Sequence, residues 1–229
     1  MIECNKYLRK KKKISKECAK AFAAKLHEAK FPELNLNAFL YEHLQGYFTD
    51  KKSELLKVGD TMEDLILITT GAMVAFFKDR DQLVVPALFK AGEFVVMPRL
   101  FNSGKQSIHT LETSREAEFV VLPKSAYHTL DALNTGKKRL IDIVSEDYWT
   151  QHHNREILRN YHSTEKLTVF YRRYPDFKGD QPKVKIEKKM LATYLSMDQS
   201  SFSRALASLK KDKEQKAEDE ICPVIQFEK

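Results

Sequence analysis

The side chains best suited to a chemical task lie between residues 187 and 209. Groups that can hydrogen-bond to bases or phosphates gather directly after Asp198: Gln199, Ser200, Ser201, Ser203 and Arg204. Arginine keeps its charge at any ordinary pH, and its planar fork of donors matches a phosphate group or a guanine edge. These side chains therefore favour contact with a nucleic acid, and we expect Arg204 to contribute most to affinity.

Lysines flank this group of side chains. Those expected to contact phosphates are Lys188, Lys189, Lys210, Lys211 and Lys213. Residues 161–216 hold thirteen basic and seven acidic residues, a net charge of +6, whereas residues 21–160 hold seventeen basic and nineteen acidic ones. Lysines that neutralise phosphates release counterions and so bind any duplex. The charge distribution therefore predicts a polyanionic partner for the C-terminal part of the chain.

Two short helices are expected to position these side chains. The first covers residues 188–194, and the second runs from its cap, Asp198, to residue 209. Ala192 is small enough for a close crossing of the two helices, Ser196 takes a turn position where glycine is more usual, and Phe202 and Leu206 are apolar. This pattern is typical of a helix-turn-helix, whose second helix enters the major groove. Helix pairs of ordinary helical domains share the pattern, so it is the surrounding positive charge that favours DNA.

A longer helix is predicted upstream, over residues 135–161, and would span close to 40 Å. Its apolar positions form a broken seam of four residues: Ile141, Val144, Tyr148 and Leu158. A long helix with such a seam usually packs against a second copy of itself. The sequence therefore predicts a homodimer through this helix.

Earlier in the chain the apolar pattern changes to a period of two or to short apolar runs, which favours strands. The predicted strands cover residues 54–58, 65–69, 73–77, 83–88, 107–112 and 118–122. Strands this short and evenly spaced indicate a β-sandwich or barrel. Helices are expected at residues 15–29, 37–46 and 165–174, and strands at 184–186 and 221–227 would close a winged hairpin.

Composition excludes several classes of protein. The 229 residues suit two domains, no apolar run approaches the length of a membrane helix, and no signal peptide is evident, so a cytoplasmic location without membrane contact is expected. Cys4, Cys18 and Cys222 lack CxxC spacing and are expected to be free thiols. No GxSxG, HExxH, Walker or GxGxxG motif occurs, so no enzymatic activity, catalytic residue, metal or cofactor is predicted.

Two segments resemble the Crp/Fnr superfamily of transcription regulators. Residues 52–130 are similar to its cyclic-nucleotide-binding β-roll, with LLKVGD (55–60), LILITTG (65–71), KAGEFV (90–95) and VVLPKSAYHTL (120–130). Residues 185–211 are similar to its DNA-recognition motif, and GEFVVMP and SSFSR look closest to the Gram-positive PrfA-like branch. The resemblance implies an α+β fold of four parts: a basic arm and helix (1–34), a β-roll effector domain (35–134), a dimerisation helix (135–161) and a winged helix-turn-helix (162–229).

The sequence departs from the nucleotide-binding members at the candidate effector pocket. That pocket is expected to comprise Val96, Met97, Arg99, Gln106 and Ser107. Val96 and Met97 replace the Gly and Glu that approach the phosphate and the ribose, and Gln106 lies near the position of the phosphate-binding Arg. An unpaired phosphate would be costly. The resemblance therefore implies an effector other than cyclic AMP, or none.

The function expected from this resemblance is sequence-specific DNA-binding transcription regulation. The implied partners are double-stranded DNA, a second copy of the chain, RNA polymerase and an unidentified small-molecule effector. Gln199 and Ser200 replace the family's usual base-reading Arg and Glu, so the family operator does not transfer. The alternative is a β-roll sensor whose helical C-terminal part binds a protein rather than DNA.

Overall fold

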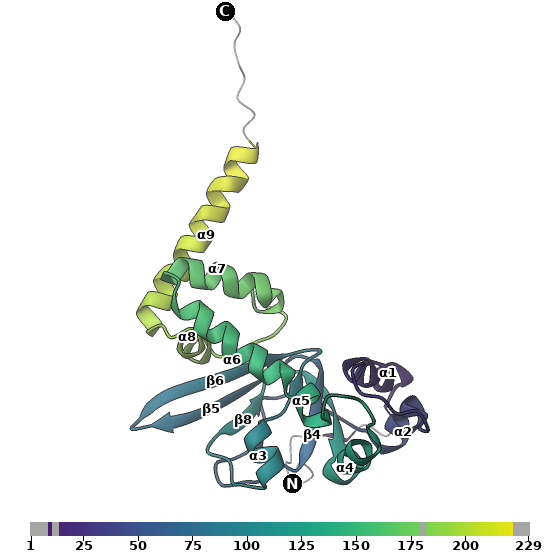
Figure 1. Ribbon diagram of the computed structural model, residues 1–229. Helices are drawn as coiled ribbons and strands as arrows, with labels where there is room; N and C mark the ends of the chain where they lie inside the picture. The colour runs from purple at the N-terminus through teal and green to yellow at the C-terminus, as the bar shows by residue number, and fades with distance from the viewer. Residues whose placement is uncertain (1–8, 11–13, 179–181, 222–229) are drawn as a thin grey trace, which may run out of the picture.

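The computed structural model describes residues 9–10, 14–178 and 182–221. Two antiparallel sheets make up the β-rich part of the molecule (Figure 1), with strand orders β1-β2-β9-β4-β7 and β3-β8-β5-β6. The strands are β1 (Arg9–Lys10), β2 (Gln45–Thr49), β3 (Glu54–Leu56), β4 (Asp64–Thr70), β5 (Ala72–Asp79), β6 (Gln82–Lys90), β7 (Phe94–Val95), β8 (Thr110–Thr113) and β9 (Ala117–Pro123). Each of the six predicted strands overlaps one of these; the sequence pattern missed β1, β2 and β7.

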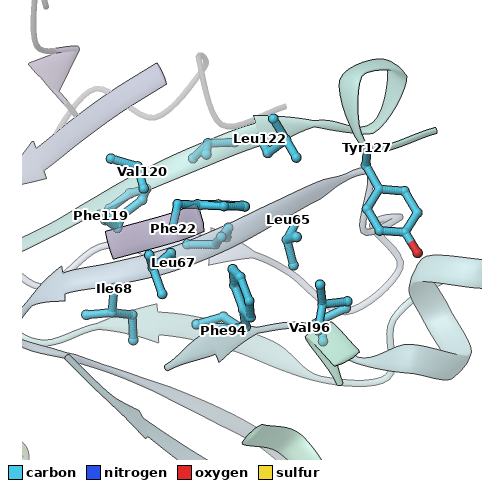
Figure 2. Packing of buried hydrophobic residues seen from close by; sticks show 14 of the residues in the cluster. Phe22, Leu65, Leu67, Ile68, Phe94, Val96, Phe119, Val120, Leu122 and Tyr127 are labelled. Carbon is cyan, nitrogen blue, oxygen red and sulfur yellow. The ribbon is translucent and has the colours of Figure 1, made fainter. Parts of the chain in front are cut away.

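The core of this part is formed by buried side chains of both sheets, together with side chains from residues 14–44 and 126–144. Residues 65–68 of β4 are all buried, as expected for a strand covered on both faces that reads as an uninterrupted apolar run. Figure 2 shows Phe22, from a helix far away in sequence, among the side chains of β4, β7 and β9. Its ring meets Phe94 edge-on, with 5.0 Å between ring centroids.

Four helices belong to this part of the chain: α1 (Lys16–Lys25), α2 (Leu36–His43), α3 (Pro98–Ser103) and α4 (Lys124–Leu133). Of these, α1, α2 and α4 pack against strands of the five-stranded sheet. Ser15 and Asn35 cap α1 and α2 by accepting from the backbone N–H groups of Cys18 and Ala38. The predicted helices 15–29 and 37–46 overlap α1 and α2, but α1 ends already at Lys25, and residues 45–46 belong to strand β2. Helix α3 was not predicted.

The C-terminal part is helical. Its elements are α5 (Leu140–Val144), α6 (Glu146–Arg159), α7 (Ser163–Arg173), the 3-10 turn η2 (Pro175–Phe177), α8 (Lys188–Tyr194) and α9 (Gln199–Ile221). The strand predicted at 184–186 does not form, and the backbone N–H of Val184 donates instead to the carbonyl of Asp176. The strand predicted at 221–227 conflicts with α9 at Ile221, and the rest of it lies outside the described residues.

The predicted continuous helix over residues 135–161 is also corrected. Gly136 lies in this range, and the two residues before it are tied to the loop after α1. The backbone N–H of Thr135 donates to the carbonyl of Lys30 at 2.9 Å, and Asn134 Oδ1 accepts from the backbone N–H of Lys30 at 3.1 Å. Helix therefore begins only at Leu140. A second break falls at Ser145, whose hydroxyl donates to the carbonyl of Ile141.

Candidate nucleic-acid interface and effector cavity

Helices α8 and α9 lie where the two helices of a helix-turn-helix were predicted, although α9 runs on to Ile221, beyond the predicted end at residue 209. Ala192 of α8 and Phe202 of α9 are both buried, as the close crossing of the two helices requires. Ser196 in the turn has a φ of +54°, the left-handed conformation that explains why glycine is usual there. The backbone N–H of Met197 donates to the carbonyl of Ala192 at 2.9 Å and closes the turn.

Asp198 caps α9 as predicted. Its carboxylate accepts hydrogen bonds from the backbone N–H of Ser201 at 2.8 Å and from the hydroxyls of Ser200 and Ser201 at 2.6 and 2.7 Å. These bonds lower the pKa of Asp198, so it stays ionised. A hydroxyl has a single proton to donate. Ser200 and Ser201 therefore spend their donor on the cap and offer only acceptor oxygens to a partner.

The start of α9 presents its remaining polar side chains to solvent. Gln199, Ser203 and Arg204 are exposed, together with Ser200, whereas Ser201 is half-buried. The guanidinium of Arg204 donates to the hydroxyl of Ser201 at 3.2 Å and forms no ion pair with any acidic residue that the structure describes. The five predicted residues thus lie together on the first turns of one helix.

The flanking lysines fall into two groups. Lys188 and Lys189, in the first turn of α8, and Lys210 and Lys211, along α9, are all exposed. The side chain of Lys213 lies outside the described residues. The four described lysines belong to the same two helices that form the motif, so cationic and hydrogen-bonding groups are combined on one helical unit.

This helical unit packs against the β-rich part of the chain. Apolar side chains of β5 and β6, among them Val74 and Val85, share one core with Leu167, Phe170 and Leu191 of α7 and α8. In Figure 1, α8 lies beside β6, and α6 runs from the sheets up to α7. The position of the motif is therefore set by the hairpin formed by β5 and β6.

A buried polar network adds to this packing. The amide oxygen of Gln151, on α6, accepts from the hydroxyls of Tyr174 at 2.6 Å and Tyr194 at 2.9 Å, and its amide nitrogen donates to Glu93 at 2.9 Å. Burial raises the pKa of both phenols, so they remain protonated donors. Burial, together with the charge of Asp147, raises the pKa of Glu93 to about 7. Sequence reasoning missed this network because its members lie far apart in the chain.

An ion pair on the surface joins the same two parts. The ammonium group of Lys52, ahead of β3, lies 3.1 Å from the carboxylate of Glu112 on β8 and 2.6 Å from that of Glu187, the residue before α8. The pair between Lys52 and Glu187, which joins the two parts, is exposed on both sides, and such pairs contribute little to stability. The apolar core and the Gln151 network are therefore the main contacts that hold the helical unit in place.

The apolar residues predicted to form the dimer seam mostly face the chain's own core. Ile141, Val144 and Leu158 are only 8%, 0% and 2% exposed, because they pack into the chain's own core, and Tyr148 is half-buried. Three of the four seam residues are thus covered without any second copy. The exposed large apolar side chains at the other face of this helix and just beyond it are Trp149, Ile157 and Tyr161.

A cavity of about 500 Å³ lies between α3, the segment before β8 and the start of α6. Its lining residues are Met97, Pro98, Arg99, Lys105, Gln106, Ile108, His109, Tyr148 and Trp149. Of the five predicted pocket residues, Met97, Arg99 and Gln106 line it. Val96 and Ser107 are buried and do not, and the hydroxyl of Ser107 donates to the carbonyl of His109 at 2.9 Å.

The cavity has apolar and aromatic walls together with two cationic side chains, Arg99 and Lys105. Tyr148 and Trp149 lie edge-to-face, with 5.2 Å between ring centroids. Burial lowers the pKa of His109, which keeps its imidazole neutral. The aromatic residues come from α6, whose place beside the pocket the sequence could not reveal.

Within the described residues, no cluster of three or more His, Cys, Asp or Glu side chains could hold a metal ion. No helix in the same part of the chain is both long and apolar enough to cross a membrane.

Comparison with known proteins defines the fold as that of Crp/Fnr-type regulators, in which a cyclic-nucleotide-binding-like β domain is followed by helices. No protein-family model and no curated protein matches the sequence. The likeness to solved structures is one of fold, at low sequence identity.

Three solved structures illustrate it. FixK2 from Bradyrhizobium japonicum superposes with a TM-score of 0.58 at 13% identity, covering 74% of this chain and 86% of that chain. A CRP-family transcriptional regulator from Thermus thermophilus gives 0.54 at 16% identity, covering 72% and 85%. The c-di-GMP-responsive global regulator CLP of Xanthomonas campestris gives 0.53 at 16% identity, covering 77% and 91%.

Proposed function

We propose that the chain is a sequence-specific DNA-binding transcription regulator of the Crp/Fnr type. The observation that carries this proposal is the start of α9, where Gln199, Ser203 and Arg204 are exposed on a capped helix. Exposed lysines on α8 and α9 add the positive charge that a phosphate backbone requires. A neighbour in fold is a transcriptional regulator of the CRP family. The motifs GEFVVMP and SSFSR favour the PrfA-like branch.

The active form that we propose is a homodimer. Ile157, near the end of α6, and Tyr161, just beyond it, are exposed and four residues apart, which supports pairing with a second copy. A two-fold dimer of helix-turn-helix units would read an inverted repeat whose half-sites lie about 34 Å apart. RNA polymerase is the partner through which such a regulator would act on transcription.

The proposed effector is not cyclic AMP. Val96 and Met97 are buried side chains where a nucleotide phosphate needs open backbone, and Pro98, which begins α3, has no backbone N–H to donate. The regulator therefore responds to a different molecule or is competent without one.

The test is recovery of genomic fragments by the purified protein, followed by binding of selected and random duplexes over a salt series. A regulator binds the selected duplex at least a thousandfold more tightly, and affinity for both falls steeply as salt rises. A chain that shifts no duplex even at low salt would instead be a β-roll sensor whose helical part binds protein.

A further inference from the structure

The cavity beside α6 exposes more apolar surface than the fold itself requires. Ile108 is 62% exposed and Trp149 is 58% exposed, although both are large apolar side chains that line the same hollow. Met97 and Tyr148 complete an apolar wall. Small-molecule sites have volumes of roughly 300–1,000 Å³ and mostly apolar walls with a few polar groups. The hollow meets this description.

Two cations lie on the same cavity. Arg99 and Lys105 line it, and none of the acidic side chains that the structure describes does. Neither cation forms an ion pair with an acidic residue in the described part of the chain. The site therefore has positive charge without a protein counter-charge, which favours an anionic ligand.

His109 also lines the cavity. The Nδ1 atom of His109 is buried and has no hydrogen-bond partner among the described residues. The ring meets Phe77 edge-on at 5.2 Å between centroids, which fixes its orientation. A buried polar atom without a partner costs free energy.

We infer that this cavity binds a small amphipathic anion, a flat apolar body with one carboxylate- or sulfonate-like group. The apolar body lies against Tyr148 and Trp149, and the anionic group is held by Arg99 and Lys105. The inference rests on the proposed function only in giving the ligand a regulatory role. Tyr148 and Trp149 lie on α6 within one helical turn of Gln151, which accepts hydrogen bonds from Tyr174, at the end of α7, and from Tyr194 of α8.

The chain contains a single tryptophan, Trp149, and it lines this cavity, so a molecule bound there should change its fluorescence. The probes are 8-anilinonaphthalene-1-sulfonate and its uncharged counterpart N-phenyl-1-naphthylamine, which share one aromatic body and differ in the sulfonate. We expect the sulfonate to quench Trp149 at one molecule per chain. It should bind at least tenfold more tightly than the uncharged probe. The double variant Arg99→Gln/Lys105→Gln should abolish that difference, whereas Lys20→Gln, which changes an exposed lysine of α1 outside the cavity lining, should leave it intact.

Three results would overturn the inference: no quenching of Trp149, equal affinity for the two probes, or unchanged sulfonate affinity in the double variant. Displacement of the probe by micromolar cyclic AMP would also overturn it, because the site would then be a nucleotide pocket. DNA binding of the unliganded protein is measured in parallel. If the protein binds the probe but no DNA, the proposed function alone is contradicted. If it binds DNA but not the probe, the inferred ligand alone is contradicted.

Discussion

Gln151 and Tyr174 are joined by a buried hydrogen bond of 2.6 Å, in which the phenol hydroxyl donates to the side-chain amide oxygen. The bond links the middle of α6 to the residue that ends α7. Tyr194 donates to the same oxygen, so one amide on α6 is hydrogen-bonded both to the end of α7 and to α8.

Gln151→Leu should lower the free energy of unfolding by roughly 2–4 kcal/mol, because two phenol hydroxyls and Glu93 lose a partner inside the protein. Tyr194→Phe removes one bond and leaves the amide oxygen satisfied by Tyr174, so a loss of about 1 kcal/mol is expected. Urea unfolding measures both, with the exposed neighbour Thr150→Ala as control. Equal losses for Gln151→Leu and Thr150→Ala would refute the network.

Glu93 should make stability depend on pH. Its pKa is raised to about 7 in the folded chain, so the folded state holds its proton more tightly than the unfolded state does. Stability is therefore highest below the unfolded pKa of about 4.5, falls as pH rises toward 7 and is flat above that. The fall amounts to roughly 3 kcal/mol, because each pKa unit corresponds to about 1.4 kcal/mol. Glu93→Gln should remove it, whereas the exposed Glu33→Gln should not.

Arg204→Ala and Lys189→Ala should weaken DNA binding in different ways. If Arg204 contacts a base, its loss costs about 1–3 kcal/mol per half-site on the selected duplex and relaxes specificity at one base pair. Loss of Lys189 weakens binding to every duplex about equally and reduces the salt slope by about one. Fluorescence anisotropy on selected and random duplexes separates the two. Wild-type affinity of Arg204→Ala for the selected duplex would show that the recognition face is misplaced.

Ser196→Gly should stabilise the chain by about 0.5 kcal/mol. Glycine relieves the left-handed strain at this turn, although part of the gain is offset by greater freedom in the unfolded state. Ser203→Gly, inside α9, is the matched control and should destabilise by about 1 kcal/mol. Thermal unfolding of both variants gives the signs, and a destabilised Ser196→Gly would contradict the turn geometry.

Substitutions on the two faces of the segment leading through α6 should have separate effects. Val144→Glu places a charge in the chain's own core and should lower stability without a specific effect on association. Ile157→Glu lies on the exposed face and should convert a dimer into a folded monomer. Light scattering at micromolar concentration, with unfolding curves as control, distinguishes them. If Ile157→Glu is still a dimer, the interface does not include this face of α6.

Local pattern was sufficient for part of the structure. The range of α8, the turn at Ser196 and the cap at Asp198 follow from neighbouring residues, and the principal strands from the period of two. The exposed face of α6 did not follow, because Ile157 and Leu158 are adjacent apolar residues and only the packing shows which one the core covers.

The contacts of Gln151 were equally out of reach. Polar residues on a long helix usually face solvent, and the partners of Gln151 are 58, 23 and 43 residues away in the sequence. The lining of the cavity was predicted only in part for the same reason. Met97, Arg99 and Gln106 lie within the segment that resembles the β-roll and were predicted, whereas Tyr148 and Trp149 belong to a helix whose position depends on the whole fold.

The shared core of Val74, Val85, Leu167, Phe170 and Leu191 bears on how the chain could be divided. A cut between the sheets and the helices would leave apolar surface exposed on both fragments, so neither should be well behaved alone. Heating should instead melt the intact chain in one cooperative transition. In hydrogen exchange, slow amides of β6 and α8 should open together, with a common free energy.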